Sequence, residues 1–166
     1  GGVGAAKTAG NYAASLYPTE LAKKQGYDQI IWTDGQEHKY IEEAGSMNIM
    51  FLIGDTLITP KSSDTILAGI TRRSVVEMVQ DWGLKVEERQ VSLAEVITAI
   101  ENKTLKEAFG VGTAATISSI EVIAHDGIDY QLPKVEDRML EKRILTALNG
   151  LKRGKIEDTR NWMYKV

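Results

Sequence analysis

Asn48-Ile49-Met50-Phe51-Leu52-Ile53 is an almost continuously apolar run. A half-exposed strand alternates polar and apolar residues, whereas an unbroken apolar run is typical of a strand that is covered on both faces. Gly54-Asp55 then turns the chain into a second strand, Leu57-Ile58-Thr59, which Pro60 ends. The sequence therefore predicts a sheet that lies between other layers of structure.

Helical and strand patterns alternate on both sides of this run. The helical patterns are Asn11 to Gln25, Val75 to Trp82, Leu93 to Ile100 and Leu140 to Leu151, and the strand patterns are Asp28 to Thr33, Leu84 to Val91, Leu105 to Phe109, Thr116 to Ala124 and Ile128 to Leu132. Pro18 predicts a kink or a break in the first helix. Ser92 to Glu95 is a capping box that begins the third, and the acidic stretch Gln36 to Ser46 is interpreted as a solvated loop. These elements predict an α/β domain.

Composition excludes several function classes. The 166 residues suit one domain, and 20 basic against 23 acidic residues give a net charge of −3, which argues against a nucleic-acid partner. The absence of cysteine excludes a disulfide framework, a thiolate metal site and a thiol nucleophile. No apolar stretch has the length of a membrane span, and no signal peptide begins the chain. We therefore expect a soluble, cytoplasmic protein without a membrane partner.

Two features could bind an ion or a cofactor. His38 and Glu42 would share a helix face, but two ligands are too few for a closed site, so we predict no metal. Lys7 lies among small residues in Gly1–Ser15, and small residues allow a backbone to approach a ligand. A P-loop is excluded because Ala6 replaces its glycine, and a dinucleotide fingerprint is excluded because the third glycine is missing. A solvated lysine and an amine nucleophile of the Schiff-base type both stay open.

Further loops of small or acidic residues follow Lys7 along the chain. Gly69-Ile70-Thr71-Arg72 leads into a helix, where an anion site and an ordinary helix start are both open. Gly110 to Ala115 is a second loop of small residues, and the acidic stretch contains Glu43. Together these loops predict the walls of one site for a phosphate-bearing cofactor.

The order and spacing of four motifs carry a resemblance to a known family. Its members are the class IV, fold-type IV pyridoxal-phosphate enzymes, and within them the branched-chain amino-acid aminotransferases; the motifs are Lys7-Thr8-Ala9-Gly10-Asn11-Tyr12, Glu43-Ala44-Gly45-Ser46-Met47-Asn48, Gly69-Ile70-Thr71-Arg72 and Phe109-Gly110-Val111-Gly112-Thr113-Ala114. Trp32-x-Asp34-Gly35 and Trp162-Met163-x-x-Val166 are similar to that subgroup as well. The resemblance implies pyridoxal 5'-phosphate as cofactor and amino transfer between leucine, isoleucine or valine and 2-oxoglutarate.

The resemblance also implies a role for each matched residue. Lys7 would hold the cofactor as a Schiff base and move a proton, and Tyr12 would bond to the ring hydroxyl. Glu43 would keep the pyridine nitrogen protonated. The remaining positions would bind the cofactor and its phosphate (Leu67, Gly69, Ile70, Thr71 and Thr113) or the substrate carboxylate (Ser46 and Ala114).

At the level of architecture, the resemblance implies a mixed sheet curling into a partial barrel with flanking helices. Residues 1–166 would be the C-terminal cofactor-binding domain of a homodimer or higher homo-oligomer, and the small N-terminal domain would be missing. We therefore expect the 166 residues alone to bind the cofactor weakly and to transaminate poorly. A D-amino-acid aminotransferase, an aminodeoxychorismate lyase and a non-catalytic domain of the same fold are the alternatives.

Overall fold

The computed structural model describes residues 3–164 as four α-helices, one 3-10 helix and ten strands. In chain order these are α1 (Ala9–Lys24), β1 (Ile31–Thr33), β2 (Tyr40–Ala44), β3 (Met47–Ile53), β4 (Thr56–Pro60), α2 (Ile70–Asp81), β5 (Lys85–Arg89), β6 (Val91–Ser92), α3 (Leu93–Glu101), β7 (Leu105–Gly112), β8 (Thr116–Ser119), β9 (Val122–His125), β10 (Ile128–Gln131), η1 (Val135–Asp137) and α4 (Leu140–Lys152). Within these residues, each helix is too short or too polar to cross a membrane.

β3 is the central strand of an eight-stranded, mostly antiparallel sheet. It pairs with β7 along most of its length, with β4 near its end and with β2 at its start. Ile49, Met50 and Phe51 are fully buried, which confirms the prediction of a strand covered on both faces.

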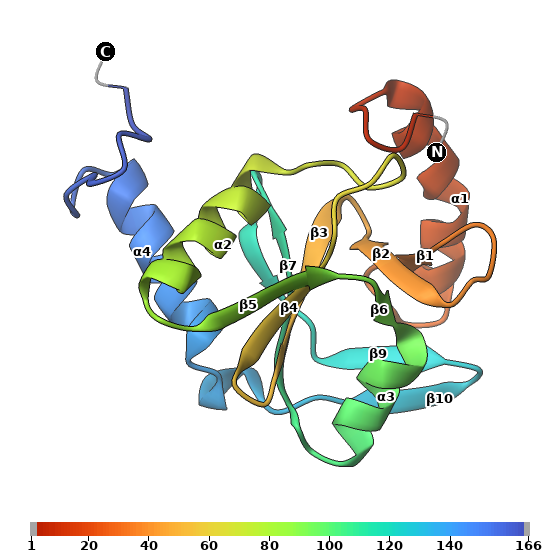
Figure 1. The fold of residues 1–166 in the computed structure, drawn as a ribbon. Helices are drawn as coiled ribbons and strands as arrows, with labels where there is room; N and C mark the ends of the chain where they lie inside the picture. Colours follow the sequence, from red (N-terminus) through yellow and green to blue (C-terminus); the bar gives the residue numbers. More distant parts are fainter. Residues whose placement is uncertain (1–2, 165–166) are drawn as a thin grey trace.

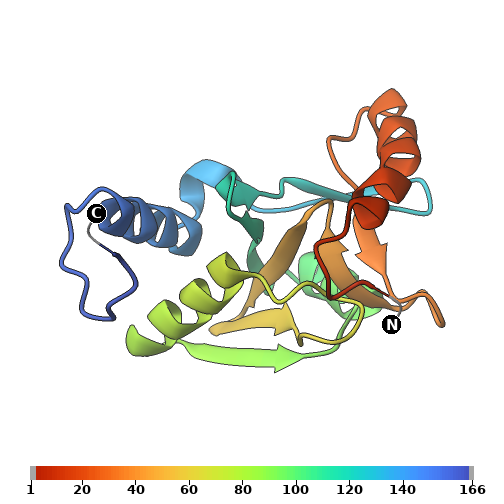
Figure 2. The ribbon, with the colours of Figure 1, turned by 90° about the horizontal axis from the view of Figure 1, so that it is seen from above.

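The two faces of β3 contribute to two separate cores, because successive side chains of a strand point to opposite faces. Ile49 and Phe51 pack in a core with residues of α3 and with Leu132, beyond β10. Met50 packs in the other core with residues of α2 and α4. Figures 1 and 2 show α2 and α4 together on one side of the sheet, whereas α3 packs on the other side and α1 lies beside β1 and β2.

The sheet folds back on itself without closing. β4 and β5 are parallel and are connected through α2, and β6, which follows β5, returns to pair with β2. Among residues 3–164 this pairing forms a curled, branched sheet and not a closed barrel. The predicted α/β class, mixed sheet and flanking helices are confirmed.

Two predictions about the strands are wrong. The stretch Gln36 to Ser46 is not a solvated loop, because Tyr40–Ala44 forms β2 between β1 and β3. The predicted strand Thr116 to Ala124 is divided into β8, which pairs with β7, and β9, which forms a separate hairpin with β10. The hairpin turn itself was predicted correctly, and its Asp126 and Gly127 have φ values of 50° and 76°.

The helix termini follow their local signals. Ser92 Oγ accepts the backbone N–H of Glu95 at 3.1 Å, so Ser92 is confirmed as the N-cap of α3, whereas the Glu95 carboxylate pairs with Arg89 instead of completing the capping box. Gly83 and Gly154 follow α2 and α4 with φ values of 82° and 64°, which glycine adopts without steric cost. The predicted break at Pro18 is wrong, since α1 is one uninterrupted helix. The carbonyl that Pro18 leaves without a donor belongs to Ala14, an exposed residue at which water can satisfy it.

Candidate active site

The turn between β2 and β3 places Glu43 opposite Asn48. The two residues are partners in the β2–β3 register. Gly45 makes this turn with φ of 57°, and a side chain there would overlap Gln29. Trp32 on β1 donates from Nε1 to the carbonyl of Gly45 at 3.0 Å. β1 therefore fixes the turn that carries the predicted site residues Glu43 and Ser46.

Asp34 explains why the Trp32-x-Asp34-Gly35 element stands before β2. Its carboxylate accepts four backbone N–H groups at 2.7 to 3.3 Å, those of Gln36, Glu37, Lys39 and Tyr40. These bonds hold the pKa of Asp34 well below its usual range, because they stabilise the charged form. The carboxylate thus shapes the loop that leads into β2.

Glu43 is the acidic group of the site. It is half-buried, and its Oε1 accepts the Nδ2–H of Asn48 and the backbone N–H of Leu67, each at 3.2 Å. Burial raises the pKa of Glu43 to about 7 against the opposing effect of the Leu67 N–H, while Glu42 adds repulsion and Lys7 adds attraction. The carboxyl can therefore gain or lose a proton near neutral pH.

The segment before Lys7 lies against the loop that precedes α2, as Figure 1 shows. The backbone N–H of Ala5 donates to the carbonyl of Asp64 at 2.9 Å. A Cβ added to Gly4 would lie only 2.6 Å from the backbone of Thr65, so this approach requires glycine. The small residues predicted to allow a close backbone approach do so here, although the partner is another loop of the same chain.

Lys7 projects from this anchored segment. Asn11 Nδ2 donates to the carbonyls of Val3 and Ala6 at 2.9 and 3.0 Å and so closes the turn before α1. The side chain of Lys7 is exposed, and its Nζ lies 5.4 Å from the centroid of the Tyr12 ring. The structure thus brings the predicted nucleophile and the predicted phenol together, on the side of the molecule where Lys7 also acts on Glu43.

The N-terminus of α2 forms a third wall of the candidate site, after the β2–β3 turn with Glu43 and the segment with Lys7. Gly69 is the N-cap, and a side chain there would overlap Oδ1 of Asn48. No side chain caps this end of the helix, so the first N–H groups, including those of Ile70 and Thr71, point away from it without an intrahelical partner. Such a helix start favours an anion. Leu67 belongs to the same wall through its bond to Glu43.

The turn after β7 forms the fourth wall of the candidate site. Val111 pairs with Asn48, and a Cβ on Gly112 would lie 3.1 Å from the side chain of Met47. The next residues, Thr113 and Ala114, are exposed, as is Ser46 in the neighbouring β2–β3 turn. The first residues of β3 therefore contact three of the four predicted motifs, and the segment before Lys7 joins them through the loop that precedes α2.

Comparison with known proteins identifies the family. Residues 3–123 match the family model described as amino-transferase class IV. The chain belongs to the class IV aminotransferases. It is 43% identical over all 166 residues to a probable branched-chain-amino-acid aminotransferase of Staphylococcus epidermidis, of which it covers 46%. The chain thus spans about half the length of the curated relatives that it matches.

Solved structures give the same class IV aminotransferase fold. The chain is similar to the branched-chain amino acid aminotransferase from Escherichia coli, with a TM-score of 0.77, 31% identity and coverage of 97% of this chain and 50% of that one. It is also similar to the branched-chain aminotransferase from Thermobaculum terrenum in its PLP-bound holo form, with a TM-score of 0.69, 27% identity and coverage of 89% and 46%. The resemblance inferred from the motifs is confirmed at the level of the family.

No role is predicted from the sequence for one polar residue of the candidate site. Asn48 begins the apolar run and ends the Glu43–Asn48 motif, and in the structure it contacts Glu43 and Leu67. Its signal was its place as the polar residue at the start of an otherwise apolar strand. His38 and Glu42 do not share a helix face, since His38 lies in the turn before β2 and Glu42 lies in that strand. Within residues 3–164 there is no group of three acidic or histidine side chains that could hold a metal.

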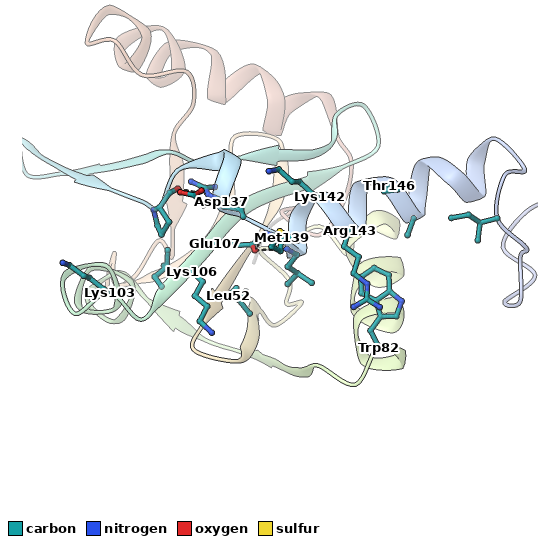
Figure 3. A pocket seen from close by; sticks show the side chains of 16 residues that line it. Leu52, Trp82, Lys103, Lys106, Glu107, Asp137, Met139, Lys142, Arg143 and Thr146 are labelled. Atoms are coloured by element: carbon teal, nitrogen blue, oxygen red, sulfur yellow. Dashed lines mark hydrogen bonds between the residues drawn. The ribbon is translucent and has the colours of Figure 1, made fainter.

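A cavity of about 1010 Å³ lies away from the aminotransferase motifs, between the start of α4, the end of α2 and the start of β7. Figure 3 shows Arg143 over Trp82 at one end of it, with 3.9 Å from the guanidinium carbon to the ring centroid. Glu107 on its wall accepts the N–H groups of Met139, Leu140 and Glu141, each at 2.8 Å. These contacts hold α4 on the sheet, and the predicted site residues do not line the cavity.

Proposed function

We propose that this chain carries the pyridoxal 5'-phosphate site of a branched-chain amino-acid aminotransferase. The reaction moves an amino group between leucine, isoleucine or valine and 2-oxoglutarate. The supporting observation is that Lys7, Glu43 and the uncapped N-terminus of α2 are tied to one another through the loop at residues 64–69. The names of the relatives at 41 to 43% identity support the branched-chain amino acids as substrates.

The residues present fit this cofactor. A primary amine, a half-buried acid and free helix N–H groups match its aldehyde, its ring nitrogen and its phosphate. Thr8 Oγ1, next to Lys7, is buried and has no hydrogen-bond partner among residues 3–164, so this wall also holds a polar atom that a ligand could satisfy. Gly4 allows the segment before Lys7 to lie close to Thr65, and Gly69 allows the start of α2 to lie close to Asn48, because a side chain at either glycine would collide with that neighbour.

The residues divide the chemistry among them. Bound pyridoxal phosphate supplies an electron sink for negative charge at the substrate α-carbon. Lys7 would hold the cofactor through its amine and would move the proton at that carbon. Glu43, whose pKa of about 7 permits either state, would serve the ring nitrogen, and Tyr12 would bind the ring hydroxyl. Thr113 and the N–H groups of Ile70 and Thr71 would bind the phosphate, and Ser46 with Ala114 would bind the substrate carboxylate.

The first test uses the absorbance of the bound cofactor in the complete polypeptide that carries residues 1–166. Lys7→Ala is expected to remove the lysine-dependent absorbance band. Lys39→Ala is the matched control, because Lys39 also lies over a tyrosine ring, with its Nζ 5.1 Å from the Tyr40 centroid, and is expected to keep the band. A band that survives in Lys7→Ala would show that the nucleophile is assigned wrongly.

Substrate choice is tested separately. L-leucine with 2-oxoglutarate is expected to turn over faster than D-alanine, and the reverse preference would refute the branched-chain assignment. We also propose that residues 1–166 are the C-terminal cofactor-binding domain of a homo-oligomer with a smaller N-terminal domain. The 166 residues alone are then expected to bind the cofactor more weakly than the complete polypeptide does, and turnover by them at the rate of the complete enzyme would contradict this.

A further inference from the structure

Asn48 contacts three parts of the site, although none of the roles above uses it. Its Nδ2 donates to the carbonyl of Leu67 at 2.8 Å and to Oε1 of Glu43 at 3.2 Å. Its Oδ1 occupies the space that a side chain on Gly69 would need. Asn48 is only 6% exposed, so these contacts take place largely out of water. A buried amide group that donates to two residues constrains the positions of both.

The sheet holds Asn48 itself in place. Its backbone lies between two strands, opposite Glu43 on β2 and opposite Val111 on β7. The residues from Leu67 to Gly69 belong to no strand, so their place beside Glu43 depends on side-chain contacts. Leu67 N donates to Glu43 Oε1 at 3.2 Å, which completes a closed set of three hydrogen bonds. Asn48 is therefore the link between a rigid strand and the loop that begins α2.

We propose that Asn48 is a positioning residue that sets the separation between the Glu43 carboxylate and the N-terminus of α2. One cofactor molecule can then meet Glu43 with its ring and the helix with its phosphate. The inference rests on the proposed function for the identity of that cofactor. The link between Asn48 and Glu43 is independent of it, because both side chains belong to the protein.

The inference has a consequence for the ionisation of Glu43. Its charged neighbours are Glu42, which accepts the Thr65 hydroxyl at 2.5 Å, and Lys7. Asn48 and Leu67 both donate to the Glu43 carboxylate, and donors of this kind favour the charged form. Loss of one such donor changes the ionisation equilibrium roughly 10- to 100-fold, which raises the pKa by about one to two.

The test compares Asn48→Leu, which has a similar size and no donor, with Ser119→Ala in the complete polypeptide. Ser119 is the matched control because its Oγ also donates to a carboxylate, that of the buried Glu141 at 2.8 Å, away from Glu43 and from the start of α2. The Glu43 carboxyl is titrated by carbon-13 NMR without cofactor and is assigned by its loss in Glu43→Gln. Binding of pyridoxal phosphate and of inorganic phosphate is measured in parallel.

Asn48→Leu is expected to raise the pKa of Glu43 by about one or more. It is also expected to weaken the binding of pyridoxal phosphate and of inorganic phosphate at least tenfold. Ser119→Ala is expected to change neither the Glu43 titration nor ligand binding, even where it lowers the melting temperature as much. A folded Asn48→Leu protein with the wild-type titration and wild-type binding would overturn the inference. Absence of a lysine-dependent cofactor band in the wild type would instead refute the proposed function, and the titration would still decide the role of Asn48.

Asn48→Asp serves where Asn48→Leu does not fold, since it keeps the shape of the side chain. Its carboxyl lies within hydrogen-bond distance of Glu43, so the two are expected to titrate as a coupled pair with one ionisation well above that of wild-type Glu43. If Glu43 and the new carboxyl titrated independently, each with an ordinary carboxyl pKa, the inference would be overturned.

Discussion

Glu43→Gln is expected to stabilise the protein without cofactor above neutral pH and to abolish tight cofactor binding. The glutamine side chain keeps the size of glutamate and can still accept the N–H groups of Leu67 and Asn48. It carries no charge, so the cost of burying an ionised carboxylate disappears. The same change removes the carboxylate that we propose for the ring nitrogen of the cofactor.

The magnitude follows from the ionisation of Glu43. Its pKa is raised from the ordinary 4.5 to about 7 in the folded protein. Between these values the folded state keeps a proton that the unfolded state has lost, so the free energy of unfolding falls as the pH rises. Above pH 7 the penalty is constant. A difference of about 2.5 in pKa corresponds to roughly 3 kcal/mol, an upper value because the side chain is partly exposed.

Urea unfolding of the two proteins at pH 4.5 and pH 8.5, both without cofactor, measures this difference. The variant is expected to be more stable at pH 8.5 by up to about 3 kcal/mol and similar in stability at pH 4.5. Glu101→Gln, at the exposed end of α3, is the control for loss of one negative charge and is expected to show no such trend. A Glu43→Gln effect that is the same at both pH values would refute the argument.

Addition of cofactor is expected to reduce or reverse this difference in stability. A ligand that binds only the folded state at 100 times its Kd adds about 2.7 kcal/mol. The wild type is expected to gain this and Glu43→Gln is not, so their melting temperatures at pH 8.5 should approach each other or cross when pyridoxal phosphate is added. Equal gains in the two proteins would show that Glu43 does not face the cofactor.

Three further substitutions test the walls of the site and the fold around it. Gly69→Ala is expected to displace Asn48, to cost about 1 to 3 kcal/mol in urea unfolding and to weaken cofactor binding, whereas Gly10→Ala, with open space around its Cβ, is expected to cost nothing. Ser92→Ala removes the cap of α3 and is expected to cost about 1 kcal/mol in the same assay. Asp34→Ala is expected to lower the melting temperature at pH 7. The difference in melting temperature from the wild type should become smaller at pH 3, because a carboxylate of lowered pKa stabilises the folded protein above its ordinary pKa of 3.8 and stabilises it less as the pH falls.

The sequence patterns that predicted the fold were local. The apolar run of β3 predicts a strand because its residues become buried. Ser92 predicts the start of α3 because its hydroxyl accepts a free backbone N–H of the same helix. β2 was missed for the opposite reason. Its Glu42 and Glu43 are polar, and in a strand their direction is set by the register with β3 and not by propensity. A strand that carries a site resembles a loop in composition.

Pairing between strands far apart in the sequence was the second limit on predicting the fold. The residues from Thr116 to Ala124 read as one strand, yet β8 belongs to the main sheet and β9 to the hairpin. Which sheet a segment joins depends on partners far along the chain, and local sequence does not specify them. Of the site, residues alone indicated a lysine in a permissive loop and a possible anion site at α2. The roles of Glu43, Tyr12 and Thr113 came from the resemblance.

The geometry accounts for the weak binding expected of residues 1–166 alone. Lys7, Ser46 and Thr113 are exposed, whereas Glu43 and Asn48 are drawn into the sheet. Charged and polar contacts made in water are weak because the solvent competes for the same groups. The half-buried wall can therefore orient a cofactor ring, but the exposed groups contribute fully only where something excludes water from them. Affinity should rise with the burial of Lys7, while the coupling of Asn48 to Glu43 should be the same in the short and the complete polypeptide.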